Sequence, residues 1–205
     1  MKRPRKILSS TVLVVLSVLA AWIVYHETRV PQNQTEVLNR MIELTKEGRY
    51  DKAIQIVDRW LTNGRRDSSK DDLLFQQIAI VYFVKAAKKP ASREDSLREA
   101  ERNLEKALEV VEKRNPEEID IGLFDVGAGY EEIENLATNG RCRYYEKARD
   151  CYIRQLPMIK GESYTAYGKT FQLEPLRREI KKHLDATETK LLQNGCRPSP
   201  GTQEK

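Results

Sequence analysis

The chain of 205 residues has few of the side chains that carry most enzyme chemistry. It contains two histidines and three cysteines, and their positions do not give the Cys and His spacing of a zinc site. His183 lies in the charged stretch Lys181-Lys182-His183, and His26 stands beside Glu27, so we interpret both as surface residues rather than acid–base groups. The sequence therefore predicts no metal, no cofactor and no catalytic residue, and we expect a protein that is not an enzyme.

Glycine and proline are also scarce, at 10 and 8 residues, which excludes collagen-like and low-complexity chains. Gly127-Ala128-Gly129 has no preceding strand and no following Lys-Ser or Lys-Thr, so it is not a phosphate-binding loop. We interpret Gly127 as a small residue at which two helices approach closely. The nearby carboxylates Glu131, Glu132 and Glu134 are interpreted as an exposed helix face.

The net charge of +5 does not indicate a nucleic-acid-binding protein. Residues 2–6 supply four of these charges, whereas residues 31–205 carry 31 basic and 30 acidic residues. Within the latter part, residues 94–134 hold 14 acidic and 5 basic residues, and residues 141–182 hold 11 basic and 5 acidic. This division is compatible with steering of a partner, with self-association, or with ordinary exposed helix faces.

Long uncharged runs are absent except for residues 7–25. A helix of this length spans about 28 Å, close to the hydrocarbon core of a bilayer, so we expect a transmembrane helix that contacts lipid. The basic residues on its N-terminal side predict a single-pass protein with residues 1–6 in the cytoplasm and the remainder on the outer, periplasmic or extracytoplasmic side. The alternative is a signal peptide cleaved after Ala20, which would release a secreted or periplasmic protein.

The three cysteines, Cys142, Cys151 and Cys196, are an odd number. On one helix Cys142 and Cys151 would point to nearly opposite sides and could not be joined. We therefore expect unpaired thiols.

After a linker at residues 26–34, apolar residues recur three and four positions apart and no strand pattern is found. Breaks fall at Gly48, Asn63-Gly64, Asn115-Pro116 and Asn139-Gly140, and Ser92-x-x-Asp95 predicts a capping box. The fold class expected is all-α, ending in a polar capping helix from Pro175. The expected domains are 1–6 (cytoplasmic flank), 7–25 (transmembrane helix), 26–34 (linker), 35–193 (helical repeats) and 194–205 (disordered tail).

Equivalent small residues recur at a constant spacing. Ala53 and Ala100 are 47 residues apart, and both Ala79 to Gly127 and Ala100 to Ala148 are 48. A repeated helix pair of this length predicts an α-solenoid of about three units, in which each unit buries one face against its neighbour.

The sequence Gly48-Arg49-Tyr50-Asp51-Lys52-Ala53, echoed by Tyr144-Tyr145-Glu146-Lys147-Ala148, resembles the turn and second helix of the tetratricopeptide repeat family. The resemblance covers residues 35–156, although the period exceeds the 34 residues of that family. It implies a non-catalytic scaffold that binds a protein or peptide partner in an assembly at the membrane. The architecture is similar to that of bacterial inner-membrane proteins with periplasmic repeats.

The resemblance also implies a groove lined by first-helix positions, without the Lys and Asn residues that clamp a peptide carboxylate in some members. Such a groove would take an apolar or helical segment, unless its residues pack against neighbouring helices. A less favoured hypothesis is an enzyme with a site in residues 157–174, where Tyr164, Tyr167 and Lys169 cluster. The groove residues expected are Leu38, Ile42, Gln76, Ile80, Phe83, Phe124, Ala128 and Glu131.

Overall fold

The computed structural model describes residues 33–62, 71–113, 122–137, 142–166 and 169–196. These segments contain α-helices, two short 3₁₀ turns (η2 and η3) and one two-stranded antiparallel sheet. In chain order the elements are α2 (Gln34–Lys46), α3 (Tyr50–Thr62), α4 (Asp71–Lys88), η2 (Pro90–Ser92), α5 (Arg93–Glu112), α6 (Gly122–Leu136), α7 (Arg143–Gln155), η3 (Leu156–Met158), β1 (Ser163–Ala166), β2 (Lys169–Gln172) and α8 (Glu174–Gln193).

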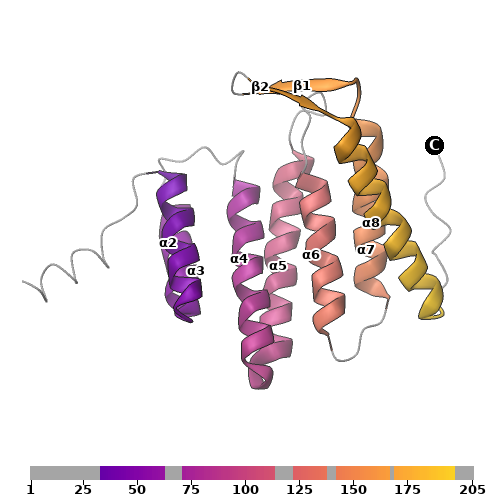
Figure 1. Ribbon diagram of the computed structural model, residues 1–205. Helices are drawn as coiled ribbons and strands as arrows, with labels where there is room; N and C mark the ends of the chain where they lie inside the picture. Colours follow the sequence, from indigo (N-terminus) through magenta and orange to yellow (C-terminus); the bar gives the residue numbers. More distant parts are fainter. Residues whose placement is uncertain (1–32, 63–70, 114–121, 138–141, 167–168, 197–205) are drawn as a thin grey trace, which may run out of the picture.

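The helices form three consecutive hairpins, α2–α3, α4–α5 and α6–α7, followed by α8 (Figure 1). In Figure 1 the first helices α2, α4 and α6, together with α8, form the nearer layer, and the second helices α3, α5 and α7 lie behind them. Helix α4 packs against α2, α3, α5 and α6, so each hairpin is joined to the next. This arrangement is repeat-like and is compatible with the helical repeat that the spacing of small residues predicted.

Local sequence explains how the first hairpin begins and turns. The Asn33 side chain caps α2 by accepting a hydrogen bond of 2.8 Å from the backbone N–H of Glu36, which satisfies a donor that the helix cannot. Gly48 has φ of +74°, a left-handed conformation that glycine adopts without a steric penalty. There the backbone N–H of Arg49 donates to the carbonyl of Leu44 at 2.8 Å, which closes α2 and directs the chain into α3.

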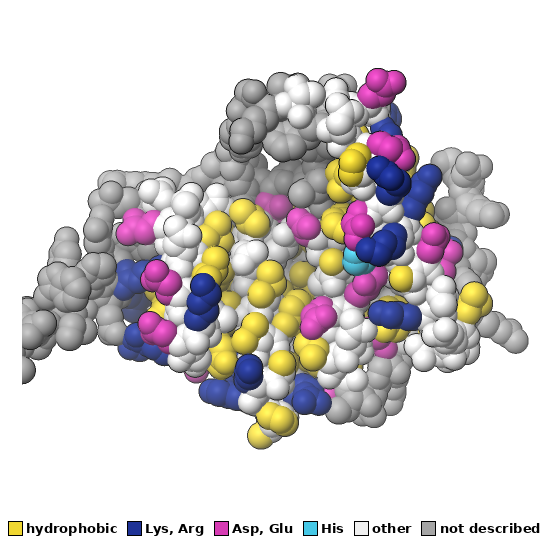
Figure 2. All heavy atoms as spheres, in the orientation of Figure 1, with side chains coloured by type: hydrophobic (Ala, Val, Ile, Leu, Met, Phe, Trp, Pro, Cys, Tyr) yellow, Lys and Arg dark blue, Asp and Glu magenta, His cyan; other side chains and the backbone are white. Residues whose placement is uncertain are grey.

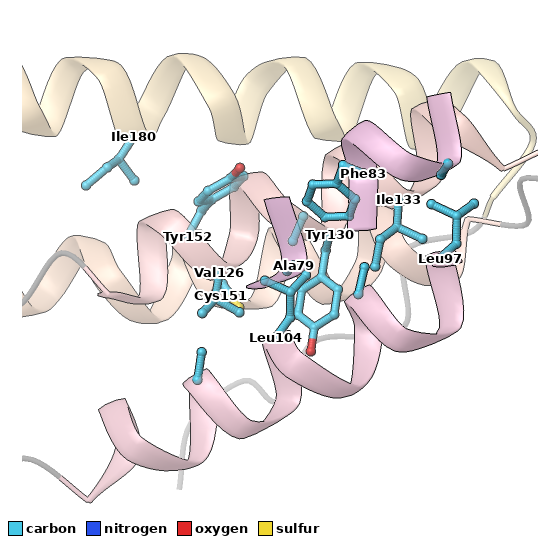
Figure 3. Packing of buried hydrophobic residues seen from close by; sticks show 14 of the residues in the cluster. Ala79, Phe83, Leu97, Leu104, Val126, Tyr130, Ile133, Cys151, Tyr152 and Ile180 are labelled. Atoms are coloured by element: carbon cyan, nitrogen blue, oxygen red, sulfur yellow. The ribbon is translucent and has the colours of Figure 1, made fainter. Parts of the chain in front are cut away.

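The repeat positions lie at the contacts between layers. Ala53, Ala79, Ala100 and Ala148 have no exposed surface, and a Cβ placed on Gly127 would lie 2.6 Å from the ring of Tyr152. The prediction that Gly127 permits a close helix approach is therefore confirmed. Figure 3 shows the surrounding core, in which Ile180 of α8 points toward Tyr152 of α7.

The hydrophobic interior consists of two clusters connected by α4. One is built mainly by α2, α3 and α4, and the other by α4 to α8 with Ile159 and Leu173. Phe75 and Tyr82 pack against both clusters. The hydrophobic interior is thus continuous through α4.

The predicted fold class is wrong in its membrane component. None of the helices in the described segments is long and apolar enough to cross a bilayer. Helices α5 and α8 each have 20 residues but carry charges along their length, and α4 contains Asp71, Asp72, Lys85 and Lys88. The stretch that prompted the expectation, residues 7–25, lies outside the described residues.

A β-hairpin interrupts the helical order, which the sequence did not predict. Strands β1 and β2 pair from Ser163 with Gln172 to Ala166 with Lys169. Its base is fixed by a hydrogen bond of 2.9 Å from the Leu173 N–H to the Glu162 carbonyl, and Leu173 is buried. Figure 1 shows the hairpin at one end of the helical layers.

Two further expectations require correction. Ser92 precedes α5, but its side chain makes no capping bond, because it lies in a 3₁₀ turn where its hydroxyl donates to the Lys89 carbonyl. The expectation of unpaired thiols is wrong for two cysteines, since Cys142 and Cys196 form a disulfide with Cα atoms 6.0 Å apart. Only Cys151 is free, and it is buried.

The disulfide also orders part of the expected tail. Cys196 is 8% exposed and packs with Tyr145 and Leu191. The two cysteines are 54 positions apart, and they meet because α8 returns along α7. Residues 197–205 of the expected tail lie outside the described residues.

Candidate functional site

A groove of about 560 Å³ lies between the first helices α4 and α6, with α5 at its floor. Its size falls in the range of about 300–1,000 Å³ that is usual for ligand sites. The residues of α4 and α6 that line it recur three and four positions apart, so each helix contributes one face. The lining residues are Leu73, Gln76, Gln77, Ile80, Phe83, Val84, Ala87, Leu104, Asp125, Ala128, Gly129 and Glu132.

Large apolar side chains are exposed in this groove. Leu73 and Ile80 are 41% and 45% exposed, although both belong to the helix that joins the two hydrophobic clusters. Figure 2 shows hydrophobic side chains gathered over α4 and between α4 and α6, on the face formed by the first helices. An exposed apolar strip of this kind marks an interaction surface when it is contiguous.

Gln76 gives the groove an unsatisfied polar group. The side chain is 7% exposed, and its Nε2 atom has no hydrogen-bond acceptor among the described residues. A buried donor without a partner costs about 1–3 kcal/mol. An acceptor brought into the groove would recover part of that free energy.

The charged side chains that line the groove are both acidic. Asp125 and Glu132 lie on α6, seven residues apart, and no Lys or Arg of the described segments joins them in the lining. Glu132 is exposed, and we find no ion pair to it within the described part of the chain. The α6 wall therefore presents negative charge beside an apolar surface.

The structure brings together half of the predicted groove residues. Gln76, Ile80, Phe83 and Ala128 all line the groove. Leu38 packs in the cluster of α2 to α4, and Ile42 is 41% exposed on α2, in the same layer as α4.

Phe124 and Glu131 lie elsewhere because α8 covers them. The Phe124 ring contacts the His183 ring edge-on at a centroid distance of 5.3 Å. Glu131 accepts a hydrogen bond from the Thr187 hydroxyl, and its Oε2 lies 3.3 Å from Nδ1 of His183. Helix α8 thus occupies the place of a next first helix, and His183 packs against the domain rather than standing in solvent.

The sequence contained a signal for the lining residues that we did not predict. Leu73, Val84 and Ala87 continue the helical spacing of Gln76 and Ile80 along α4. Asp125, Gly129 and Glu132 do the same around Ala128 on α6. Leu104, at the floor of the groove, belongs to the second helix α5. Its side chain packs close to Gly129, where a Cβ would lie 2.7 Å from it.

The opposite face, formed by α5 and α7, is held by ion pairs. Glu101 of α5 accepts hydrogen bonds from Lys147 at 2.7 Å and from the Tyr144 hydroxyl at 2.8 Å, and it also pairs with Arg143 at 2.5 Å. Burial raises the pKa of the Glu101 carboxyl, but the bonds from Lys147 and Tyr144 and the positive charges outweigh it, so that the pKa lies below its ordinary value. Burial and the bond to Glu101 raise the pKa of Tyr144 to about 12.

A second, smaller cavity of about 460 Å³ lies on this charged face and reaches Cys151. Burial raises the pKa of the Cys151 thiol to about 12, so the thiol is protonated at neutral pH and is a poor nucleophile. In the segments that the structure describes, no group of His, Cys, Asp and Glu side chains is arranged to hold a metal ion. The side chains of Tyr164, Tyr167 and Lys169, the less favoured enzyme site, lie outside what is described.

No protein-family model, no curated protein and no solved structure matches this chain. The groove is therefore the feature of this protein that bears on its function.

Proposed function

We propose that this protein is a non-catalytic interaction module whose first-helix face binds an apolar segment of a protein partner. The observation that carries the proposal is the groove between α4 and α6, in which Leu73 and Ile80 are 41% and 45% exposed. Burying each side chain against a partner would contribute about 1–2 kcal/mol. The described residues that line the groove include no nucleophile paired with a base, which supports binding rather than catalysis.

The module is of the tetratricopeptide-repeat kind, with extended helices. Support comes from the turn at Gly48 and from the buried small residues at equivalent positions of successive hairpins, including Ala100 and Ala148. In such repeats the first helices line one binding surface, and here the groove is formed by two consecutive first helices.

The helical domain functions on the outer side of the cell membrane, in an oxidising compartment. The disulfide between Cys142 and Cys196 supports this location, because such bonds persist outside the cytosol. The test is to denature the protein at isolation in the presence of an alkylating reagent and without a reductant. One cysteine of three should then be alkylated. Reaction of all three would argue for a reducing compartment.

Site-specific cross-linking in cells tests the proposed binding surface. A photo-reactive phenylalanine analogue replaces Ile80 in the full chain, and the matched control carries it at Ile153, which is 41% exposed on α7 and outside the groove. We expect a discrete protein adduct from position 80 that is absent from position 153.

A second substitution makes the test specific. Ala128→Arg places a long side chain on the groove wall and should abolish the adduct. Equal adducts from both positions, or an adduct that survives Ala128→Arg, would contradict the proposal.

A further inference from the structure

We infer that the segment bound in this groove is a basic amphipathic helix with a side-chain hydrogen-bond acceptor on its apolar face. The inference builds on the proposed function and adds the chemistry of the partner. It depends on three properties of the groove: its helical walls, the sign of its charges and the unsatisfied amide of Gln76.

The walls favour a helix over an extended strand. Both are α-helices, whose backbone N–H and C=O groups are already paired within each helix, so an incoming strand would find no free ladder to join. Recognition must therefore occur through side chains. The lining of α4 extends from Leu73 to Ala87, about 21 Å along the helix axis, a length that matches about four turns of a bound helix.

The charges favour a basic segment. Among the described residues, the ionisable ones that line the groove are Asp125 and Glu132, both acidic and two helical turns apart on α6. Figure 2 shows acidic side chains beside the hydrophobic strip. A helix lying along α6 with Lys or Arg residues seven positions apart would place one cation near each carboxylate.

Gln76 favours a polar atom within the apolar face of the partner. Its Nε2 is covered and has no acceptor among the described residues, and the residue itself lines the groove. The backbone carbonyls of a bound helix are already paired, so the acceptor is a side-chain oxygen such as that of Thr. This contact distinguishes the site from a purely apolar groove.

Defined peptides provide the test. Three fluorescent peptides of about 15 residues share an apolar face made of leucines three and four positions apart and a central Val. They differ only at two flanking positions, seven residues apart, which are both Lys, both Gln or both Glu. A fourth peptide is the Lys peptide with Thr in place of the central Val. Titration of the full chain should give about tenfold tighter binding of the Lys peptide than of the Glu peptide, decreasing with salt.

Substitutions assign the preferences to residues. Glu132→Lys should reverse the charge preference, whereas Glu109→Lys on α5, outside the groove, should leave it unchanged. The unmodified protein should bind the Thr peptide about fivefold more tightly than its Val counterpart. Gln76→Leu should abolish that difference, and Gln55→Leu on α3 should retain it. Because these readouts compare peptides on one protein, loss of stability does not imitate them.

Three results would overturn the inference. Equal binding of the Lys, Gln and Glu peptides, weakened by Ile80→Gln in every case, would refute the charge selection and leave the proposed function standing. Absence of binding by all peptides, together with an adduct from position 80, would refute the helical ligand alone. A dimer detected by light scattering and dissociated by Ile80→Gln would assign the groove to a second copy of the chain.

Discussion

The two faces of the helical array use their side chains in opposite ways. On the face of α4 and α6, large apolar residues are exposed and the Gln76 amide lacks an acceptor among the described residues. On the face of α5 and α7, Glu101, Glu105 and Glu112 are paired with cations. The contrast indicates that charge joins one hairpin to the next, whereas apolar surface remains for a partner.

The ion pairs explain the uneven distribution of charge along the sequence. Arg154 pairs with Glu112 at 2.7 Å across 42 positions, and Lys147 reaches Glu105 at 3.0 Å across the same separation. The acidic middle and the basic end of the chain therefore meet on adjacent hairpins. Ion pairing between neighbouring hairpins was not among the three interpretations that the sequence left open, and it accounts for these residues.

The largest expected effect on stability comes from the disulfide, which ties α7 to the end of α8. Cys196→Ser opens a loop of 54 positions and should lower the free energy of unfolding by about 4 kcal/mol. Denaturant titration measures the loss. Cys151→Ser is the control, because that thiol is unpaired. Dithiothreitol should destabilise Cys151→Ser, which keeps the disulfide, but should leave the stability of Cys196→Ser unchanged. If dithiothreitol leaves the unmodified protein unchanged, the disulfide does not hold α8.

A smaller effect is expected where the two layers approach most closely. Gly127→Ala places a Cβ 2.6 Å from the Tyr152 ring, which is fully buried, and the ring must move. Overpacking costs about 1–3 kcal/mol and exceeds the gain in helix propensity of about 1 kcal/mol. Gly129→Ala meets only the flexible end of Leu104 and should be nearly neutral. Thermal unfolding of both variants compares them, and equal losses would contradict this account.

The charged face predicts a pH-dependent effect. Since the pKa of Glu101 is depressed in the folded protein, its contribution is present above its ordinary value of 4.5 and is lost as pH falls through the folded value. Glu101→Gln should therefore lower the free energy of unfolding by about 1–2 kcal/mol at pH 7, and the difference from the unmodified protein should shrink below pH 4.5. Glu109→Gln is the exposed control. A difference that does not change with pH would show that the charge is unimportant.

The smallest effect on stability is expected on the apolar face. Ile80→Gln and Ile153→Gln change side chains of similar exposure and should each alter the free energy of unfolding by no more than about 0.5 kcal/mol. Binding should separate them, because burying the exposed part of the Ile80 side chain against a partner contributes about 1–2 kcal/mol. Peptide affinity should fall about tenfold for Ile80→Gln alone. A marked loss of stability for Ile80→Gln would indicate that the groove is part of the core.

Much of the fold could be predicted because its signals are local. The turn at Gly48, the apolar spacing of α4 and the recurrence of Ala100 and Ala148 each depend on residues within one or two helices. The β-hairpin was missed because its strands are four residues each, too short for an alternating pattern to stand out. Its sequence signal was the presence of Tyr164, Thr165, Thr170 and Phe171, residue types that favour strands.

The candidate site was predicted only in part because it depends on contacts between hairpins. Phe124 and Glu131 occupy the same repeat positions as residues of α4 that line the groove, yet α8 covers them. The sequence could not show where the last helix would lie. The acidic wall of Asp125 and Glu132 was missed for a related reason, since its importance follows from facing an apolar helix across a groove.

The sequence by itself determined the helices, the period of the repeat and the small residues at its contacts, because each depends on spacing along one helix or between equivalent helices. Tertiary structure decided which cysteines pair, which charges meet and which apolar residues remain exposed. Those outcomes depend on segments more than 40 positions apart in the chain. They follow from how the final helix packs against the third hairpin and how neighbouring hairpins stack.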